Sequence, residues 1–360
     1  MKKYALIGEN ISYSFSPKLH EFLFQHFNRR ASYDLLDIEA DVLEKEFLNI
    51  VKEYDGFNVT TPYKNTVFSK LQLLSDGAKC TGSVNTVVKF DGRVVGYNTD
   101  LFGINQTFKR NFSLGGAAYS LSGKTVLVIG AGDTARTLIH YLLTQGSNVI
   151  VLARNLQKIK EMRDYLQQIN SGNTQSSAVK NTEFADEESN DTALSSDYTQ
   201  NGNAQGDNTR GGNTQSDAGS APKNPTAKKL AIKAKNYTQA HKGEIVGMYV
   251  SEKDISKPYN IVINTTPLGN ANNINQSPLN LSILKSAGAT GLEFVLDTAY
   301  TPEKTQLLKN ADSLNIRNTN GFTMLLFQAL KSQEVWLGRT VKPSRLEQVY
   351  NEIRGILYNN

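Results

Sequence analysis

The chain has 360 residues, and its 39 lysines and arginines outnumber its 34 aspartates and glutamates by five. This length suits two domains of ordinary size. So small a positive charge, without a dense basic stripe interleaved with aromatics, argues against a nucleic-acid-binding protein and is compatible with an anionic small-molecule ligand.

Cysteine and histidine content limits the chemistry further. The single cysteine, Cys80, excludes an intrachain disulfide framework and a cysteine-based zinc or iron–sulfur site. The four histidines form no HxxxH pair, so we expect no metal. The first residues make a poor signal peptide and no stretch approaches the ~20 apolar residues that span a bilayer, so we expect a soluble cytoplasmic protein without a membrane partner.

The first hundred residues predict strands and helices in alternation. The helical stretches carry apolar residues mainly at helical spacing, and Asp91-Gly92 is a strong hairpin turn. We expect strands at 3–7, 31–38 and 56–59, helices at 17–29 and 39–53, and a hairpin of 84–90 with 93–97.

A second unit begins after residue 100. Its first strand, 125–129, is an apolar run rich in β-branched residues, as expected for a strand buried on both faces. The remaining elements are a helix through about 145, a strand at 148–152, a helix at 155–169 and buried strands at 260–263 and 293–297. This alternation predicts an α/β fold with a parallel sheet.

A long polar tract interrupts the second unit. Residues 171–230 contain one Phe, one Tyr and no Trp, Ile or Met, and they are rich in Asn, Gln, Ser, Thr, Gly and Asp. Such a composition cannot bury enough apolar surface to offset the entropy of ordering. We interpret 171–242 as a low-complexity, disordered surface insertion; docking of a partner there is the alternative.

A glycine-rich loop follows the strand 125–129 and precedes a helix, the context of a dinucleotide-binding site. Its first glycine permits the tight turn, its second lets a pyrophosphate approach the backbone, and a small residue lets helix and strand pack closely. We expect Asp133 to cap the helix with its side chain pointing away from the phosphates. The loop consists of Gly130, Ala131, Gly132, Asp133, Thr134 and Ala135.

Arg154 ends the next strand, 22 residues after Gly132. NAD enzymes usually carry an acidic residue near this point, whereas a cation suits the 2′-phosphate of NADP. Lys158 lies one helical turn further on and adds positive charge. The sequence therefore favours NADP.

Six separated polar motifs, in this order, resemble the shikimate dehydrogenase family over nearly the whole chain except roughly 171–242. Asn320-Gly321 and Gln328 follow them near the end of the chain. The motifs are Ser14-x-Ser16-Pro17, Asn58-Val59-Thr60-x-Pro62-x-Lys64, Val84-Asn85-Thr86, Gly96-x-Asn98-Thr99-Asp100, Asn264-Thr265-Thr266-Pro267-Leu268-Gly269 and Asp297-x-x-Tyr300-x-Pro302-x-x-Thr305.

The resemblance implies a role for each matching residue. Lys64 and Asp100 would be the catalytic pair. Thr265 and Thr266 would contact the nicotinamide side of the cofactor, and Gly321 would also bind the cofactor. The substrate would be bound by Ser14, Ser16, Asn58, Thr60, Asn85, Tyr300 and Gln328.

The resemblance also implies two domains. Residues 1–100 with 321–360 would form an α/β substrate domain, and residues 101–320 a doubly wound Rossmann domain that binds NADP. The implied reaction is reversible NADPH-dependent reduction of 3-dehydroshikimate to shikimate, in the pathway to chorismate and the aromatic amino acids.

Two alternatives remain at this point. A quinate/shikimate dehydrogenase of broader specificity could use NAD, and a non-catalytic member could bind ligand as a sensor. A thioester-forming reductase needs a nucleophilic cysteine, and Cys80 lies outside any such motif. The protein could be a monomer or a homodimer.

Overall fold

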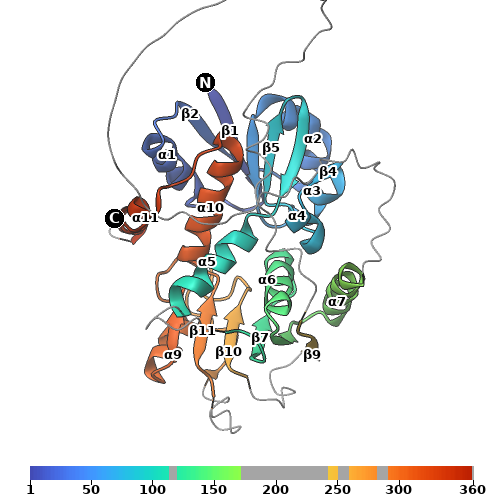
Figure 1. The fold of residues 1–360 in the computed structure, drawn as a ribbon, viewed down its shortest axis with the longest axis vertical. Coiled ribbons are helices and arrows are strands. Elements are labelled where there is room, and N and C mark those ends of the chain that lie inside the picture. The colour runs from blue at the N-terminus through green and yellow to red at the C-terminus, as the bar shows by residue number, and fades with distance from the viewer. Residues whose placement is uncertain (113–119, 172–241, 250–258, 282–290, 359–360) are drawn as a thin grey trace, which may run out of the picture.

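The computed structural model describes residues 1–112, 120–171, 242–249, 259–281 and 291–358, and two sheets organise them (Figure 1). The predicted insertion at 171–242 lies almost wholly outside the described residues. None of the described helices has the length and apolar character that crossing a bilayer requires.

The first sheet comes from the N-terminal part of the chain, in the strand order β2-β1-β3-β5-β6-β4. It is mixed, because β5 pairs antiparallel with both β3 and β6 whereas β1 pairs parallel with β2 and β3. Its strands are β1 (Lys2–Gly8), β2 (Ala31–Asp37), β3 (Gly56–Val59), β4 (Leu73–Leu74), β5 (Thr86–Phe90) and β6 (Arg93–Tyr97). The helices among them are α1 (Ser16–His26), α2 (Ala40–Glu53), α3 (Lys64–Lys70) and α4 (Asp76–Thr81).

The second sheet is parallel throughout its described pairs, with the order β12-β11-β10-β7-β8-β9. This is the doubly wound order, which reverses between β7 and β10. The strands are β7 (Thr125–Ile129), β8 (Asn148–Leu152), β9 (Ile245–Tyr249), β10 (Ile261–Asn264), β11 (Phe294–Asp297) and β12 (Arg317–Thr319). The helices that accompany them are α6 (Asp133–Thr144), α7 (Leu156–Asn170) and α9 (Gln306–Ser313). The predicted parallel α/β fold is confirmed.

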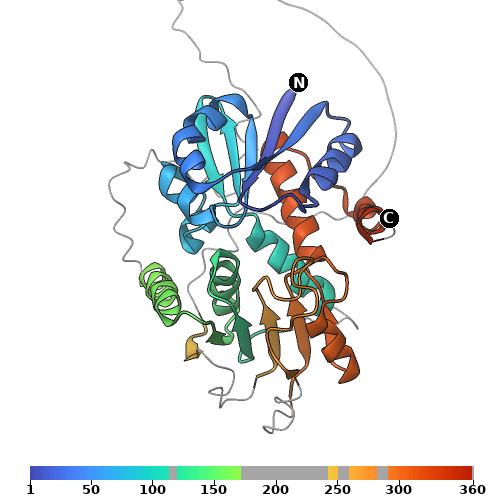
Figure 2. The same ribbon diagram turned by 180° about the vertical axis from the view of Figure 1, so that it is seen from behind.

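Helices α5 (Asp100–Phe112) and α10 (Phe322–Leu337) lie side by side between the two sheets (Figures 1 and 2). Ile104 of α5 and Met324 of α10 belong to the apolar core of the second sheet. Leu326 of α10 instead packs in a cluster with Leu19 of α1. Because these helices belong to both packing units, they fix how the two sheets meet. The final helix, α11 (Pro343–Tyr358), packs on α10.

Candidate active site

A cavity of about 220 Å³ opens where the first sheet, α10 and the start of α6 converge. Every residue predicted for catalysis or substrate binding lines it, together with Thr134 and Gly321 of the predicted cofactor set. These lining residues are Ser14, Ser16, Asn58, Thr60, Lys64, Asn85, Asp100, Tyr300 and Gln328. Residues from five of the six motifs thus share one cavity with Gln328 from near the end of the chain.

Lys64 and Asp100 form a buried ion pair in this cavity. Lys64 is the first residue of α3 and Asp100 the first of α5, so two helix starts present the two groups to each other. Lys64 Nζ lies 2.6 Å from Asp100 Oδ2, and the residues are only 8% and 4% exposed. A buried ammonium beside a carboxylate can donate a proton to a bound oxygen.

Asp100 is held by a second set of contacts besides Lys64. Asn85 Nδ2 donates to Asp100 Oδ1 at 2.8 Å, and the Asp100 backbone N–H donates to Asn98 Oδ1 at 3.1 Å. Asn85 Oδ1 accepts from the backbone N–H of Thr99 at 2.7 Å, which fixes the Asn85 amide in turn. The carboxylate is therefore oriented before any substrate arrives.

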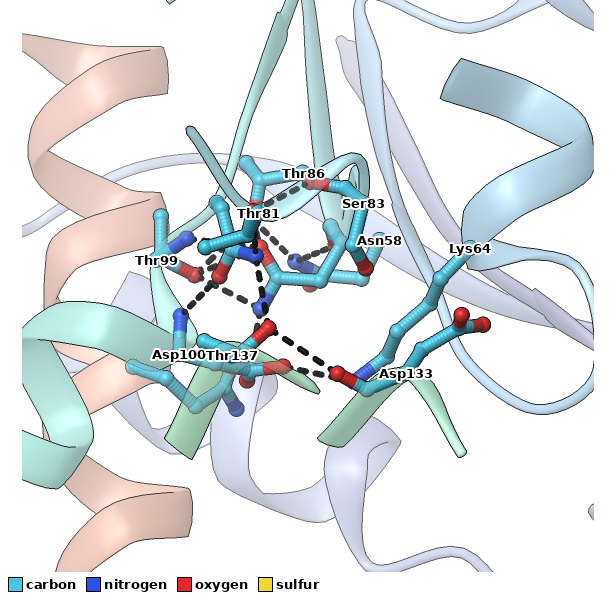
Figure 3. Close-up of polar contacts among 12 residues, drawn as sticks. Asn58, Lys64, Thr81, Ser83, Thr86, Thr99, Asp100, Asp133 and Thr137 are labelled. Carbon is cyan, nitrogen blue, oxygen red and sulfur yellow. Dashed lines mark hydrogen bonds and ion pairs between the residues drawn. The ribbon is translucent and has the colours of Figure 1, made fainter. Parts of the chain in front are cut away.

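Asn58 lines the cavity, but its amide is engaged by protein partners. Tyr33 Oη donates to Asn58 Oδ1 at 2.8 Å. Asn58 Nδ2 lies 3.0 Å from both Thr86 Oγ1 and Ser332 Oγ (Figure 3). The structure therefore supports a role for Asn58 in shaping the cavity wall. Tyr33 and Ser332 were not predicted, because no motif connects residues so distant in the chain.

The cavity also carries hydroxyls and an amide. The Ser16 backbone N–H donates to Ser14 Oγ at 3.2 Å, and Gln328 Nε2 donates to the Leu325 carbonyl at 2.9 Å. Burial raises the pKa of Tyr300, and hydrogen bonds with the Phe15 backbone and the Ser14 side chain oppose this rise. These neutral donors suit an anionic group such as a carboxylate.

The glycine loop lies at the reversal point of the second sheet. Gly130 has a φ of +120°, and a Cβ there would collide with Thr265 Oγ1, so only glycine fits. A Cβ at Gly132 would instead meet no atom within 4 Å, so the backbone there is open to an approaching ligand. Thr265 Oγ1 donates to the Ile129 carbonyl at 2.7 Å, which joins the 264–269 loop to β7.

The helix cap predicted for Asp133 is wrong. Gly132 occupies the N-cap position and Asp133 is the first residue of α6. The Asp133 carboxylate pairs with Arg136 one turn later, at 2.7 Å. Arg136 offsets the negative charge of the Asp133 carboxylate. Asp133 therefore repels a phosphate at the glycine loop less than an unpaired carboxylate would.

Arg154 and Lys158 are both exposed beyond the carboxyl end of β8. The backbone N–H of Gly130 donates to the Leu152 carbonyl at 2.8 Å, so the Arg154 segment lies next to the glycine loop. Asn155 caps α7 by accepting from the Lys158 backbone N–H. An open glycine loop flanked by two exposed cations fits a dinucleotide with an extra phosphate. Within the described residues, no three His, Cys, Asp or Glu side chains cluster as metal ligands would.

This fold and cavity define a class of α/β proteins in which a substrate-binding unit faces a dinucleotide-binding sheet. Residues 6–87 match the family model of the shikimate dehydrogenase substrate-binding domain, and residues 113–186 match that of shikimate/quinate 5-dehydrogenase. The chain is therefore similar to the shikimate dehydrogenase family in two separate regions.

Individual relatives match along the whole chain. A protein of Clostridium perfringens named shikimate dehydrogenase (NADP(+)) is 26% identical over 358 residues, covering 98% of this chain and 99% of the relative. The structure of shikimate dehydrogenase 1 from Peptoclostridium difficile superposes with a TM-score of 0.67 at 22% identity, covering 99% and 100% of the two chains. That of the Thermus thermophilus enzyme in complex with NADP(H) and shikimate gives 0.64 at 20% identity, covering 98% and 99%.

Proposed function

We propose that the protein is an NADP-dependent shikimate dehydrogenase, which reversibly reduces 3-dehydroshikimate to shikimate on the pathway to chorismate and the aromatic amino acids. The observation that carries the proposal is the buried Lys64–Asp100 pair, 2.6 Å apart, in the wall of a cavity beside the glycine-loop helix. The full-length match to relatives named shikimate dehydrogenase (NADP(+)) supports the same reaction.

The two residues of the pair divide the acid–base work. NADPH, when bound, supplies the hydride for the ketone carbon. Lys64 lies where its ammonium can stabilise the negative charge that grows on the ketone oxygen and donate the proton. Asp100 keeps that ammonium oriented through Oδ2, while Asn85 holds Oδ1. In the reverse direction Lys64 accepts the proton of the hydroxyl being oxidised.

The remaining cavity residues bind and orient the substrate. Ser14, Ser16 and Tyr300 line the cavity, and their hydroxyls can donate to the carboxylate. Thr60, Asn85 and Gln328 supply donors and acceptors for the ring hydroxyls, and Asn58 shapes the same cavity wall. Several fixed contacts hold the ring in one orientation, so that the ketone faces the ammonium.

The cofactor is held by the second sheet. The loop from Gly130 to Ala135 would hold the pyrophosphate, and Arg154 with Lys158 would bind the 2′-phosphate. Thr265 and Thr266 would border the nicotinamide, and Gly321 would contact the cofactor. Residues 1–100 together with 321–360 form the domain that binds the substrate, and residues 101–320 form the domain that binds the cofactor. The protein acts in the cytoplasm, as a monomer or a homodimer.

A broader quinate/shikimate dehydrogenase is the second candidate, because the family model matched by residues 113–186 covers both activities. Quinate carries one more hydroxyl at the carboxylate-bearing carbon, so the space beside Ser14 decides between the two. A non-catalytic sensor is less favoured, since such a protein has no need of both Lys64 and Asp100.

Initial rates of NADP reduction with shikimate test the proposal, repeated with quinate and with NAD. We expect turnover with shikimate and NADP, and a lower kcat/KM for the other three combinations. Comparable turnover of quinate or comparable use of NAD would establish the broader enzyme. Binding of shikimate without any turnover would establish the sensor.

A further inference from the structure

Asn98 connects the acid–base pair to the cofactor side of the molecule. This side chain precedes α5 and is 7% exposed. Its Oδ1 accepts from the backbone N–H of Asp100 at 3.1 Å. Its Nδ2 donates to Thr81 Oγ1 at 2.8 Å and to Thr137 Oγ1 at 3.0 Å. Both amide hydrogens and the amide oxygen are therefore engaged.

Thr137 lies on α6, the helix that begins at the glycine loop, and it is fully buried. Its hydroxyl donates to the Asp133 carbonyl at 3.0 Å, and the same oxygen accepts from Asn98 (Figure 3). A hydroxyl can make both bonds at once. The result is a continuous chain of hydrogen bonds from Asp133 through Thr137 and Asn98 to the Asp100 backbone.

A second hydrogen bond between the same two units provides a contrast. Tyr165 Oη of α7 donates to the Lys79 carbonyl of α4 at 2.5 Å, and both residues are at least partly exposed. Lys79 does not line the cavity. Removing the Tyr165–Lys79 hydrogen bond therefore tests contact between the two units while the hydrogen bonds of Asn98 stay in place.

We propose that Thr137 is a positioning residue, whose buried hydroxyl couples the dinucleotide-binding helix to Asp100 through the Asn98 amide. This inference rests on the proposed function. The hydride must reach the carbon and the proton the oxygen of the same carbonyl group. The cofactor loop and the Lys64–Asp100 pair must therefore keep a fixed position relative to each other. Small displacements of reacting groups lower rates steeply.

The test compares serine with alanine at two positions of α6. Thr137→Ser and Thr137→Ala both lack the methyl group and differ only in the hydroxyl. Thr144→Ser and Thr144→Ala are the matched control, because Thr144 is also buried on α6 and its hydroxyl donates only to the nearby Tyr141 carbonyl. Tyr165→Phe removes the other hydrogen bond between the units.

Two quantities are measured for each variant. The first is the pair kcat and KM for shikimate and NADP. The second needs no turnover: the Kd of NADPH, followed by its fluorescence, without and with saturating shikimate. The ratio of the two Kd values reports how strongly the two sites are coupled.

We expect Thr137→Ala to lower kcat about tenfold while KM for shikimate stays within about twofold, and to bring the Kd ratio close to one. Thr137→Ser, both Thr144 variants and Tyr165→Phe should retain the wild-type kcat and Kd ratio. If Thr137→Ala does not fold, Thr137→Val takes its place, with Thr137→Ser still the comparison.

Equal behaviour of serine and alanine at position 137 would overturn the inference. So would a wild-type Kd ratio of one, or a loss at position 144 as large as that at 137. Failure of the proposed function has a different signature, since the wild-type protein itself would then turn over no shikimate.

Discussion

The two sides of the active site are built in opposite ways. On the substrate side, Lys64, Asp100 and Asn85 are buried and bonded to one another. On the cofactor side, Arg154 and Lys158 are exposed to solvent beyond the end of β8. A buried side chain with all its hydrogen bonds made acts through its fixed position. An exposed cation acts mainly by raising the affinity for the cofactor, through an electrostatic attraction that salt weakens. Substitutions on the two sides should therefore affect different kinetic constants.

The largest effect should come from Lys64→Ala, which removes the proton donor. We expect kcat for shikimate oxidation to fall on the order of 10²-fold or more, with a smaller change in KM. Lys70→Ala is the matched control, because Lys70 lies on the same helix and also pairs with a carboxylate, Glu44, at 2.5 Å. Steady-state kinetics decide the matter, and a near-normal kcat would remove Lys64 from the mechanism.

The cofactor side should respond in KM instead. Arg154→Ala should raise KM for NADP about tenfold or more, the scale of a lost hydrogen bond to a charged group, and should change KM for NAD little. The wild-type preference for NADP should also weaken as salt is added. Lys160→Ala is the control, because Lys160 is an exposed lysine of α7, the helix that follows Arg154. Equal changes for both cofactors would refute contact with the 2′-phosphate.

Asp297, behind the 264–269 loop, should affect stability. Burial raises its pKa to about 6, and hydrogen bonds from Thr305, Ala299 and Asn264 only partly oppose this. Between its ordinary pKa and about 6 the folded state holds a proton that the unfolded state has lost. Stability therefore falls as pH rises through this range, by up to about 3 kcal/mol.

Urea denaturation of wild type and Asp297→Asn at pH 4 and pH 7 isolates this contribution, because all other groups are common to both proteins. We expect the free energy of unfolding of wild type, relative to the variant, to decrease by up to about 3 kcal/mol between the two pH values. A difference that does not change with pH would show that Asp297 titrates normally.

The smallest effect should come from deleting residues 172–230. Their polar composition predicts that they add little to a packed core. Turnover and melting temperature of the shortened chain should match those of the full chain within experimental error. Loss of the folded protein on deletion would show that the segment has a structural role.

Sequence patterns predicted the strands better than the helices near the site. Continuous apolar runs such as 125–129 leave little choice but a buried strand, and β7 has those bounds. Helix α5 was not predicted, because Asp100 in the Gly-x-Asn-Thr-Asp motif was interpreted as a catalytic residue and not as the start of a helix. Leu101, Ile104 and Phe108 recur at helical spacing and could have revealed it.

The cavity itself was predicted through its motifs, but its supporting contacts were not. Ser332 reaches Asn58 across 274 positions of the chain, and Thr137 reaches Asn98 from helix α6, which accompanies the second sheet. Serine and threonine in helices carry no pattern that distinguishes such contacts from local bonds to the backbone. Only the packing of α10 against β5 and of α6 against α4 brings these hydroxyls to the site.

The central claim is that Lys64 and Asp100 act as one catalytic unit, and a double-mutant cycle tests it most directly. The measurement is kcat for shikimate oxidation in Lys64→Ala, Asp100→Asn and the double variant. A carboxylate that works by orienting the ammonium has no further role once the ammonium is gone. The double variant should therefore lose no more than Lys64→Ala alone. Losses that multiply across the two substitutions would contradict the claim.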